Sequence, residues 1–205
     1  MSNHEVVIID YNTGNVDSLL KAVKITNKSA IISKNKNDIL NCKKIILPGQ
    51  GSFDYGMSQL NILNLKDIIL KKVLEDQIPI LGICLGMHLL GDIGYENNLK
   101  TQGFRLIGGE IKKIPTKLKL PHIGWNEVKF KKKNNVFNKI RNNKDFYFVH
   151  SYYFDCINKD DIYGTTNYDL NFPSIIIKKN IYGFQFHPEK SLNNGLALLN
   201  NFLNL

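Results

Sequence analysis

Two short segments of the sequence carry side chains that together could perform nucleophilic catalysis. The segment GICLG (82–86) places the thiol of Cys84 between two glycines, and HPE (187–189) places His187 two residues before Glu189. A cysteine nucleophile needs a base close to its thiol and a further group that orients the base. The carboxylate of Glu189 can turn back to the imidazole, and Pro188 restricts the backbone between them. The pattern therefore predicts Cys84, His187 and Glu189 as a catalytic triad.

The setting of Cys84 favours a nucleophile, although the pentapeptide alone also allows a buried core thiol. The segment lies where an apolar strand ends and a helix begins, which is the G-x-nucleophile-x-G turn of a nucleophile elbow. Flanking glycines relieve the crowding in such a turn, and the start of the helix favours a thiolate. The main-chain amide of Leu85 could help to hold an oxyanion. Cys42 and Cys156 lack this setting, so we expect them to be core or surface thiols.

A third segment, PGQGSF (48–53), is glycine-rich and follows another strand-like run. Gly49 and Gly51 let the backbone approach a ligand and turn its amides toward it. We expect Gly49, Gln50 and Gly51 to form an oxyanion-binding loop together with the amide of Leu85. Taken alone, the segment could also be an ordinary turn. A phosphate-binding loop is disfavoured because no G-K-[ST] follows.

The elements that would position these segments alternate between strand and helix in the first half of the chain. Apolar runs predict strands at 6–10, 30–33, 44–47 and 79–83, and apolar spacing predicts helices at 14–26, 65–76 and 84–90. Such an alternation is typical of a parallel sheet with helices on both faces.

Strands dominate the second half of the chain. They are predicted at 106–114, 126–130, 146–149, 162–165, 174–178 and 181–185, with a tight turn at 179–180 and a final helix at 195–203. The chain has no internal repeat and no linker long enough to divide it. We therefore expect one α/β domain spanning residues 1–205, with a central, mostly parallel sheet flanked by helices and an antiparallel extension.

The composition is that of a soluble globular protein. The 205 residues are 43% hydrophobic and 22% charged, and the apolar runs are too short to cross a bilayer. Three cysteines argue against a disulfide framework, and none has zinc-site spacing. The N-terminus shows no secretory signal. We expect a cytoplasmic protein that needs no metal and no cofactor.

The net charge of +9 comes largely from short lysine runs, at 112–113, 117–119 and 129–133. Such runs are usually solvated loops. The alternative is a surface that attracts an acidic partner or substrate. Nucleic-acid binding is not expected, because no recognised nucleic-acid-binding motif accompanies the charge.

The three motifs resemble those of the class I, or triad-type, glutamine amidotransferases. GICLG and GFQFHPEKS carry this resemblance, and their GxCLG and HPE patterns are shared across many amidotransferases. The segments DYNTGN (10–15), PGQGSF, PHIGWN (121–126) and HSY (150–152) are similar to the glutaminase subunits of imidazole glycerol phosphate synthase. The resemblance extends from Asp10 to the C-terminal helix, which is nearly the whole chain.

The resemblance implies a role for each segment. Cys84 would attack the carboxamide of L-glutamine and form a γ-glutamyl thioester, while His187 moves protons and Glu189 orients it. The loop 49–51 and the Leu85 amide would stabilise the tetrahedral intermediate. The residues that would bind glutamine are His88, His150, Ser151 and Tyr152.

The resemblance also implies a partner. Ammonia would pass to a cyclase subunit of (β/α)8-barrel fold in a heterodimer that forms imidazole glycerol phosphate and AICAR in histidine biosynthesis. Asn12, Asn15 and Trp125 would lie near the interface between the subunits. Packing in the core is the alternative for Trp125.

Two positions depart from the family pattern. His88 stands where the family usually has Gln, one helical turn beyond Cys84 on the same face. A protonated imidazole cannot donate and accept together as an amide does. Gln50 stands where Val is frequent in the oxyanion loop. Both changes could retune glutaminase activity.

Three other functions fit parts of the pattern. A paralogue of this subunit supplies ammonia for an amidine group on a surface-polysaccharide sugar, and its motifs look alike. A stand-alone γ-glutamyl hydrolase would use the same triad, although PHIGWN argues against it. A non-catalytic binding module is opposed by the intact set of Cys84, His187 and Glu189.

Overall fold

The computed structural model describes residues 4–26, 28–97 and 99–205. Its main feature is a nine-stranded sheet in the order β2-β1-β3-β4-β13-β12-β11-β8-β9. The strands of this sheet are β1 (Val6–Ile9), β2 (Ala30–Ser33), β3 (Lys44–Leu47), β4 (Ile80–Ile83), β8 (His122–Phe130), β9 (Lys144–His150), β11 (Ile162–Tyr168), β12 (Leu170–Lys178) and β13 (Ile181–Phe184).

The large sheet has a parallel half and an antiparallel half. Strands β2, β1, β3, β4 and β13 are parallel to one another, whereas β12, β11, β8 and β9 continue the sheet with antiparallel pairs. Because β4 and β13 are parallel neighbours, the segments that follow them leave the sheet at the same edge. The GICLG and HPE motifs therefore come together although about a hundred residues separate them.

A second, four-stranded sheet in the order β10-β7-β5-β6 lies beside the first. Its strands are β5 (Ile93–Glu96), β6 (Leu99–Gln102), β7 (Gly109–Lys113) and β10 (Tyr152–Cys156). The corner between β9 and β10, at residues 150–152, carries the chain from the large sheet to the small one.

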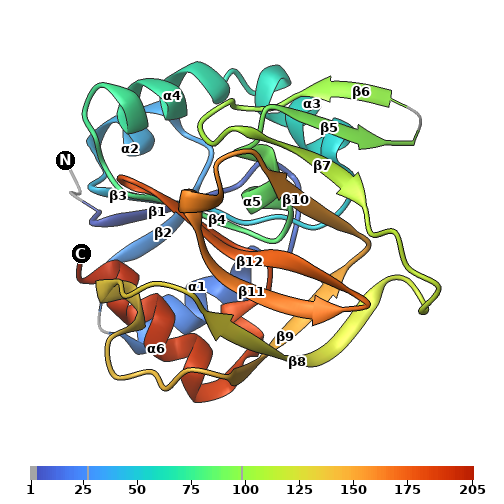
Figure 1. The fold of residues 1–205 in the computed structure, drawn as a ribbon. Coiled ribbons are helices and arrows are strands. Elements are labelled where there is room, and N and C mark those ends of the chain that lie inside the picture. The colour runs from blue at the N-terminus through green and yellow to red at the C-terminus, as the bar shows by residue number, and fades with distance from the viewer. Residues whose placement is uncertain (1–3, 27, 98) are drawn as a thin grey trace.

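Helices cover both faces of the large sheet (Figure 1). Helices α1 and α6 lie on one face, and the others lie on the opposite face together with the small sheet. The helices are α1 (Val16–Ile25), α2 (Lys36–Asn41), α3 (Phe53–Ile62), α4 (Lys66–Leu74), α5 (Leu85–Leu89) and α6 (Leu192–Leu203). Short 3-10 turns are at Asn135–Phe137, Lys159–Asp161 and Pro188–Lys190. The part of the chain described contains no helix with the length and apolar character needed to span a bilayer.

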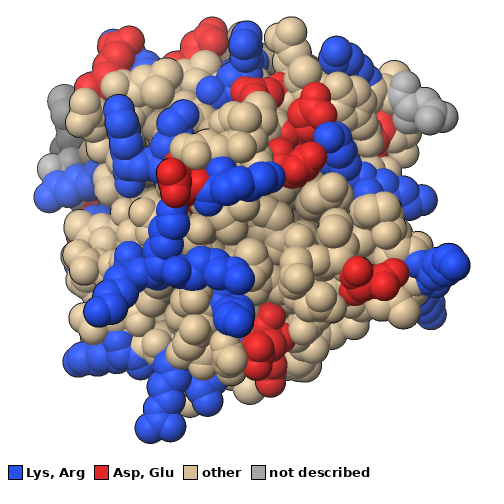
Figure 2. All heavy atoms as spheres, in the orientation of Figure 1, with Lys and Arg blue, Asp and Glu red and all other residues tan. Residues whose placement is uncertain are grey.

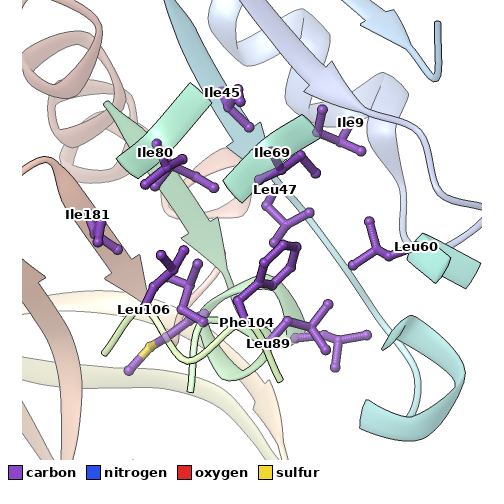
Figure 3. Packing of buried hydrophobic residues seen from close by; sticks show 14 of the residues in the cluster. Ile9, Ile45, Leu47, Leu60, Ile69, Ile80, Leu89, Phe104, Leu106 and Ile181 are labelled. Carbon is purple, nitrogen blue, oxygen red and sulfur yellow. The ribbon is translucent and has the colours of Figure 1, made fainter. Parts of the chain in front are cut away.

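The sheet separates two hydrophobic cores, which explains the unbroken apolar runs of its parallel strands. In β1, Val7 and Ile9 face one core and Val6 and Ile8 face the other, because side chains alternate along a strand. Figure 3 shows how the loop residue Phe104 packs with strand and helix residues in the first core.

The predicted fold class is confirmed, and most predicted strands and helices are present with bounds shifted by a few residues. The bounds of two predicted strands need correction, and some elements were missed. Residues 106–108 precede β7 rather than belong to a strand, and β8 begins at His122, four residues before the predicted start. Helices α2 and α3 and strands β5, β6 and β10 were not predicted. Cys42 and Cys156 are free, buried thiols, in agreement with the expectation of core or surface thiols.

Lysine and arginine side chains gather on one part of the surface, at the lower left of Figure 2. The loop that joins β8 to β9 contributes Lys131, Lys132, Lys133 and Lys139. Of these, Lys132 pairs with Asp160 at 2.9 Å.

Candidate active site

Cys84 lies at a sharp turn between β4 and α5. Its φ is 52° and its ψ is −109°, a conformation that non-glycine residues rarely adopt. A Cβ on Gly82 would lie 2.5 Å from the carbonyl oxygen of Gly86, and a Cβ on Gly86 would overlap the carbonyl of Leu47. The two glycines of GICLG are therefore required by the close approach of strand and helix, as expected for a nucleophile elbow.

A cavity of about 430 Å³ opens beside this turn. It is lined by residues from several segments, namely Gln50, Gly51, Cys84, Leu85, His88, Glu96, Pro121, Val149, His150, Ser151, Tyr152, His187 and Lys190. The cavity thus brings together the three motifs, which are far apart in the sequence.

His187 and Glu189 form a buried pair at the cavity. The Nδ1 of His187 lies 2.9 Å from Oε1 of Glu189, and the two side chains are 3% and 6% exposed. A carboxylate only accepts hydrogen bonds, so Nδ1 carries the proton and donates it. In the neutral imidazole Nε2 is then the bare nitrogen, and it has no hydrogen-bond partner among the described residues. His187 is therefore oriented as a base whose accepting atom is free.

The charge on the two neighbours of His187 decides its protonation. Burial lowers the pKa of His187, but the thiolate form of Cys84 and the Glu189 carboxylate outweigh burial and raise this pKa well above its ordinary value. The Sγ of Cys84 donates to the carbonyl of Val149 at 3.6 Å. A rotation of the S–H bond toward His187 would pass the proton to the imidazole and leave a thiolate paired with an imidazolium.

The predicted oxyanion loop lies at the same cavity. Gln50, Gly51 and Leu85 line it, whereas Gly49 lies behind them. A Cβ on Gly49 would collide with the hydroxyl of Tyr11, which donates to the carbonyl of Pro48. Gly51 has φ +110°, a backbone conformation that favours glycine.

The residues predicted to bind glutamine all line the cavity, but His88 is engaged elsewhere. Its Nε2 lies 2.7 Å from Oε1 of Gln185 on the buried side. Burial lowers the pKa of His88 to about 4, against the raising effect of the Gln185 contact. His88 is therefore neutral at pH 7, and its Nε2 is not available to a ligand. Ser151 and Tyr152 are half-buried and face the cavity.

Two charged residues of the cavity were missed at the sequence level. Glu96, at the end of β5, accepts a hydrogen bond from the amide of Phe53 at 2.7 Å. Burial raises its pKa, while the Phe53 contact lowers it. Lys190 lies over the ring of Tyr147, 5.9 Å from its centroid. No motif marked Glu96, but Lys190 directly follows HPE, so its position beside the triad could have indicated it.

The predicted interface residues are accessible. Trp125 is 49% exposed and contacts Tyr147 edge to face, so the alternative of core packing for Trp125 is wrong. The side chain of Asn12 donates to Gln59 at 2.8 Å, and that of Asn15 caps α1 by accepting from Ser18.

A larger cavity, of about 720 Å³, lies away from these residues. The lysine-rich loop between β8 and β9 lines it, and none of the predicted catalytic residues does. The predicted nucleophile and base, Cys84 and His187, therefore lie at the smaller cavity. The described residues contain no group of three or more His, Cys, Asp or Glu side chains placed to hold a metal ion.

Comparison with known families and proteins gives a consistent result. The family model described as "Glutamine amidotransferase class-I" matches residues 7–205. The chain is 47% identical to "Imidazole glycerol phosphate synthase subunit HisH 2" of Methanococcus maripaludis, with 97% of this chain and 98% of that protein covered. It is 46% identical to the HisH subunit of Methanocaldococcus jannaschii and 41% identical to that of Pelagibacter ubique, with similar coverage.

Solved structures share the fold at low sequence identity. A structure of PurLQS from Thermotoga maritima superposes with a TM-score of 0.72 at 17% identity, and the match covers 98% of both chains. The glutaminase domain of Trypanosoma brucei CTPS superposes with a TM-score of 0.69 at 15% identity, covering 97% of this chain and 91% of that one.

Proposed function

Because this chain belongs to the class I glutamine amidotransferases and, within them, to the HisH subunits of imidazole glycerol phosphate synthase, we propose that Cys84, His187 and Glu189 hydrolyse L-glutamine at the cavity described above. The chain is thus the glutaminase subunit of a synthase of histidine biosynthesis. The observation that carries the proposed site is the buried His187–Glu189 pair, which leaves Nε2 free beside the strained Cys84.

The first half of the reaction forms the thioester. His187 takes the thiol proton of Cys84, and Sγ attacks the carboxamide carbon of glutamine. Negative charge develops on the carboxamide oxygen, which the amides of Leu85 and of the loop 49–51 stabilise. His187 then gives its proton to the leaving nitrogen, and ammonia departs.

In the second half, water attacks the thioester carbon while His187 takes a proton from it. The bond between Sγ and carbon breaks, and glutamate leaves. Throughout, Glu189 holds the imidazole in the orientation that keeps Nε2 toward Cys84, and it stabilises the imidazolium.

Charge complementarity supports the binding of an amino acid in the cavity. Glutamine carries an ammonium and a carboxylate, and the cavity presents Glu96 and Lys190 as its charged side chains besides the histidines and Cys84. We assign Glu96 to the ammonium group. The corner formed by Ser151 and Tyr152 holds the rest of the amino-acid end.

Ammonia released at Cys84 passes to a partner subunit of (β/α)8-barrel fold, which forms imidazole glycerol phosphate and AICAR. The names of the relatives as synthase subunits support such a complex. The exposed Trp125 on β8 supports an interface beside the cavity, and we assign the exposed Asn12 and Asn15 to the same interface.

The test is the variant Cys84→Ala, assayed together with the partner cyclase. We expect glutamine-dependent synthesis to fall by about a thousandfold or more, because the thioester cannot form. Synthesis from free ammonium salts should remain within about twofold of the wild type, because that reaction occurs on the other chain. A variant that still uses glutamine, or that loses the ammonia-dependent reaction as well, would contradict the proposal.

A second function deserves a direct test, because Methanococcus maripaludis contains relatives named HisH 1 and HisH 2. One copy of such a pair could supply ammonia for amidine formation on a surface sugar. Complementation of a histidine auxotroph that lacks its own HisH subunit separates the two. Growth without histidine supports the histidine pathway, and failure with a soluble, glutaminase-active chain supports the alternative. Rapid glutamate release without any partner would instead favour a stand-alone γ-glutamyl hydrolase.

A further inference from the structure

A chain of hydrogen bonds connects the glutamine cavity to strand β8. His122 and His150 lie directly opposite each other on β8 and β9, and Nδ1 of His122 is 3.0 Å from Nε2 of His150. On one side, Nδ1 of His150 lies 2.8 Å from the carbonyl oxygen of Tyr152. On the other side, Nδ2 of Asn126 lies 3.2 Å from Nε2 of His122. The mechanism proposed above uses neither His122 nor Asn126.

The chemistry of the end groups fixes the direction of every bond in this chain. A carbonyl only accepts, so Nδ1 of His150 carries the proton and donates to Tyr152. A neutral imidazole has one N–H, so Nε2 of His150 is bare and accepts from the N–H at Nδ1 of His122. Nε2 of His122 is bare for the same reason, and it accepts from the amide of Asn126.

The orientation of Asn126, at the other end of this series of hydrogen bonds, is fixed as well. The amide nitrogen of Asn126 also donates to the carbonyl of Asn167 at 2.9 Å, and its oxygen accepts from the amide of Glu127 at 2.8 Å. The amide of Asn126 therefore cannot be turned over without losing both contacts. Each imidazole is thus confined to its Nδ1–H tautomer.

Protonation of either ring would break this series of hydrogen bonds, called the relay below. The surroundings of both rings disfavour protonation. His122 is 3% exposed and His150 is 6% exposed. Burial lowers the pKa of His122 to about 4 and that of His150 to about 3. The ring of His122 is also held between Tyr168 and Phe148, with centroids 4.1 and 5.0 Å away.

We propose that His122 and Asn126 are positioning residues that hold the β9–β10 corner of the glutamine cavity through a one-way relay ending on the Tyr152 carbonyl. This inference rests on the proposed glutaminase function. Ser151 and Tyr152 of this corner line the cavity, and Val149, whose carbonyl contacts the Cys84 thiol, directly precedes it. The relay begins on the strand whose exposed residues include Trp125. It ties the corner to the edge of the molecule where we place the partner.

The test variant is His122→Phe, which keeps an aromatic ring between Tyr168 and Phe148 but removes both relay bonds. We expect the KM for glutamine to rise roughly tenfold, the effect of one or two lost hydrogen bonds. The kcat should change by less than about threefold, because the triad is untouched. The matched control is Tyr168→Phe. It removes the hydrogen bond from the Tyr168 hydroxyl to the carbonyl of Lys119, keeps an aromatic ring stacked on His122 and leaves the relay intact. Its KM should stay within about twofold.

The tautomers supply a readout that does not depend on activity. Long-range proton–nitrogen correlation spectra of the ¹⁵N-labelled chain, which has only five histidines, should show neutral Nδ1–H forms for His122 and His150 at pH 7. In Asn126→Ala, the second variant, His122 loses one of the two contacts that fix its tautomer, so a fraction of the Nε2–H form should appear beside the Nδ1–H form, and KM should rise less than in His122→Phe. This variant keeps the proposal testable if His122→Phe does not fold.

The outcomes separate this inference from the proposed function. A wild-type chain with no glutaminase activity, alone or with its partner, would overturn the proposed function, and the spectra would still decide the relay. An active wild type with an unchanged KM in His122→Phe would overturn the positioning role. An Nε2–H tautomer or a protonated ring at pH 7 in the wild type would overturn the relay itself.

Discussion

His88 and Gln185 contact each other in the core, one helical turn beyond the proposed nucleophile. His88 is 6% exposed, and Gln185 is fully buried with its Nε2 unpartnered among the described residues. His88 is therefore a titratable ring in a site that holds it neutral. At the scale of single residues, three buried histidines share this condition: His88, His122 and His150.

We predict that His88→Gln makes stability less sensitive to acid. The pKa of His88 is lowered in the folded state, to about 4, from about 6.5 in the unfolded chain. Unfolding therefore takes up a proton between these values, so the stability present above about pH 6.5 is lost as the pH falls toward 4. Removing the ring should reduce the slope of unfolding free energy near pH 5 by about 1.4 kcal/mol per pH unit, the effect of one proton.

Urea unfolding measured at pH values from 4.5 to 7.5 gives this slope directly. His4→Gln, which changes a half-buried histidine ahead of β1, is the matched control. Equal slopes in His88→Gln and the wild type would show that His88 titrates alike in the folded and unfolded chains. His122 and His150 should keep the slope of both variants positive.

At the scale of elements, the turn between β4 and α5 depends on how closely strand and helix approach. Cys84 takes a positive φ, and the glycines on each side are where a Cβ would meet backbone atoms. The neighbouring strands β3 and β13 fix β4 on both sides, so the backbone cannot move aside. The elbow is therefore held by the sheet, not by its own five residues.

We predict that Gly86→Ala destabilises the fold by about 3 kcal/mol or more, because its Cβ would overlap the carbonyl of Leu47. Gly108→Ala is the matched control, since the nearest atoms to its Cβ lie 3.8 Å away, an ordinary contact. Its unfolding free energy should stay within about 1 kcal/mol of the wild type. Similar free energies for the two variants in urea unfolding would mean that the elbow can relax, contrary to this account.

At the scale of the whole molecule, one edge of the large sheet combines the cavity with exposed apolar side chains. Ile123 and Trp125 on β8 are 60% and 49% exposed, and Pro121, just before this strand, lines the cavity. Exposed aromatic side chains are frequent anchors of protein interfaces. A partner bound on this edge would lie beside the place where ammonia is released.

We predict that Trp125→Ala weakens binding of the partner cyclase by roughly thirtyfold or more, since buried interface tryptophans often contribute about 2 kcal/mol. Stability of the isolated chain should hardly change, because half of the side chain is already in solvent. Leu74→Ala on α4, where Leu74 is 59% exposed, is the control and should bind normally. Calorimetric titration measures both. Normal binding by Trp125→Ala would remove this residue from the interface.

How much the sequence revealed depended on how local each feature is. The near-continuous apolar runs of β1 to β4 and the glycine-flanked Cys84 are local patterns, so they predicted the parallel sheet, the elbow and the triad residues. The family is readable for the same reason, since its motifs are short and contiguous. Strands β5 and β6 were missed because they are short, and β6 is largely exposed, so neither shows a clear apolar alternation.

Only the tertiary structure decided which distant residues meet. Glu96 reaches the cavity because β5 pairs with β7 in a sheet that no sequence pattern indicated. The relay exists because β8 and β9 pair in the register that sets His122 opposite His150. Strand pairing is a long-range interaction, set by which surfaces can be buried together, and the spacing along one strand does not encode it. For the same reason, the sequence predicted Cys84, His187 and Glu189 as a triad, while the fold decided that Cys84 and His187 line one cavity and that Glu189 contacts His187.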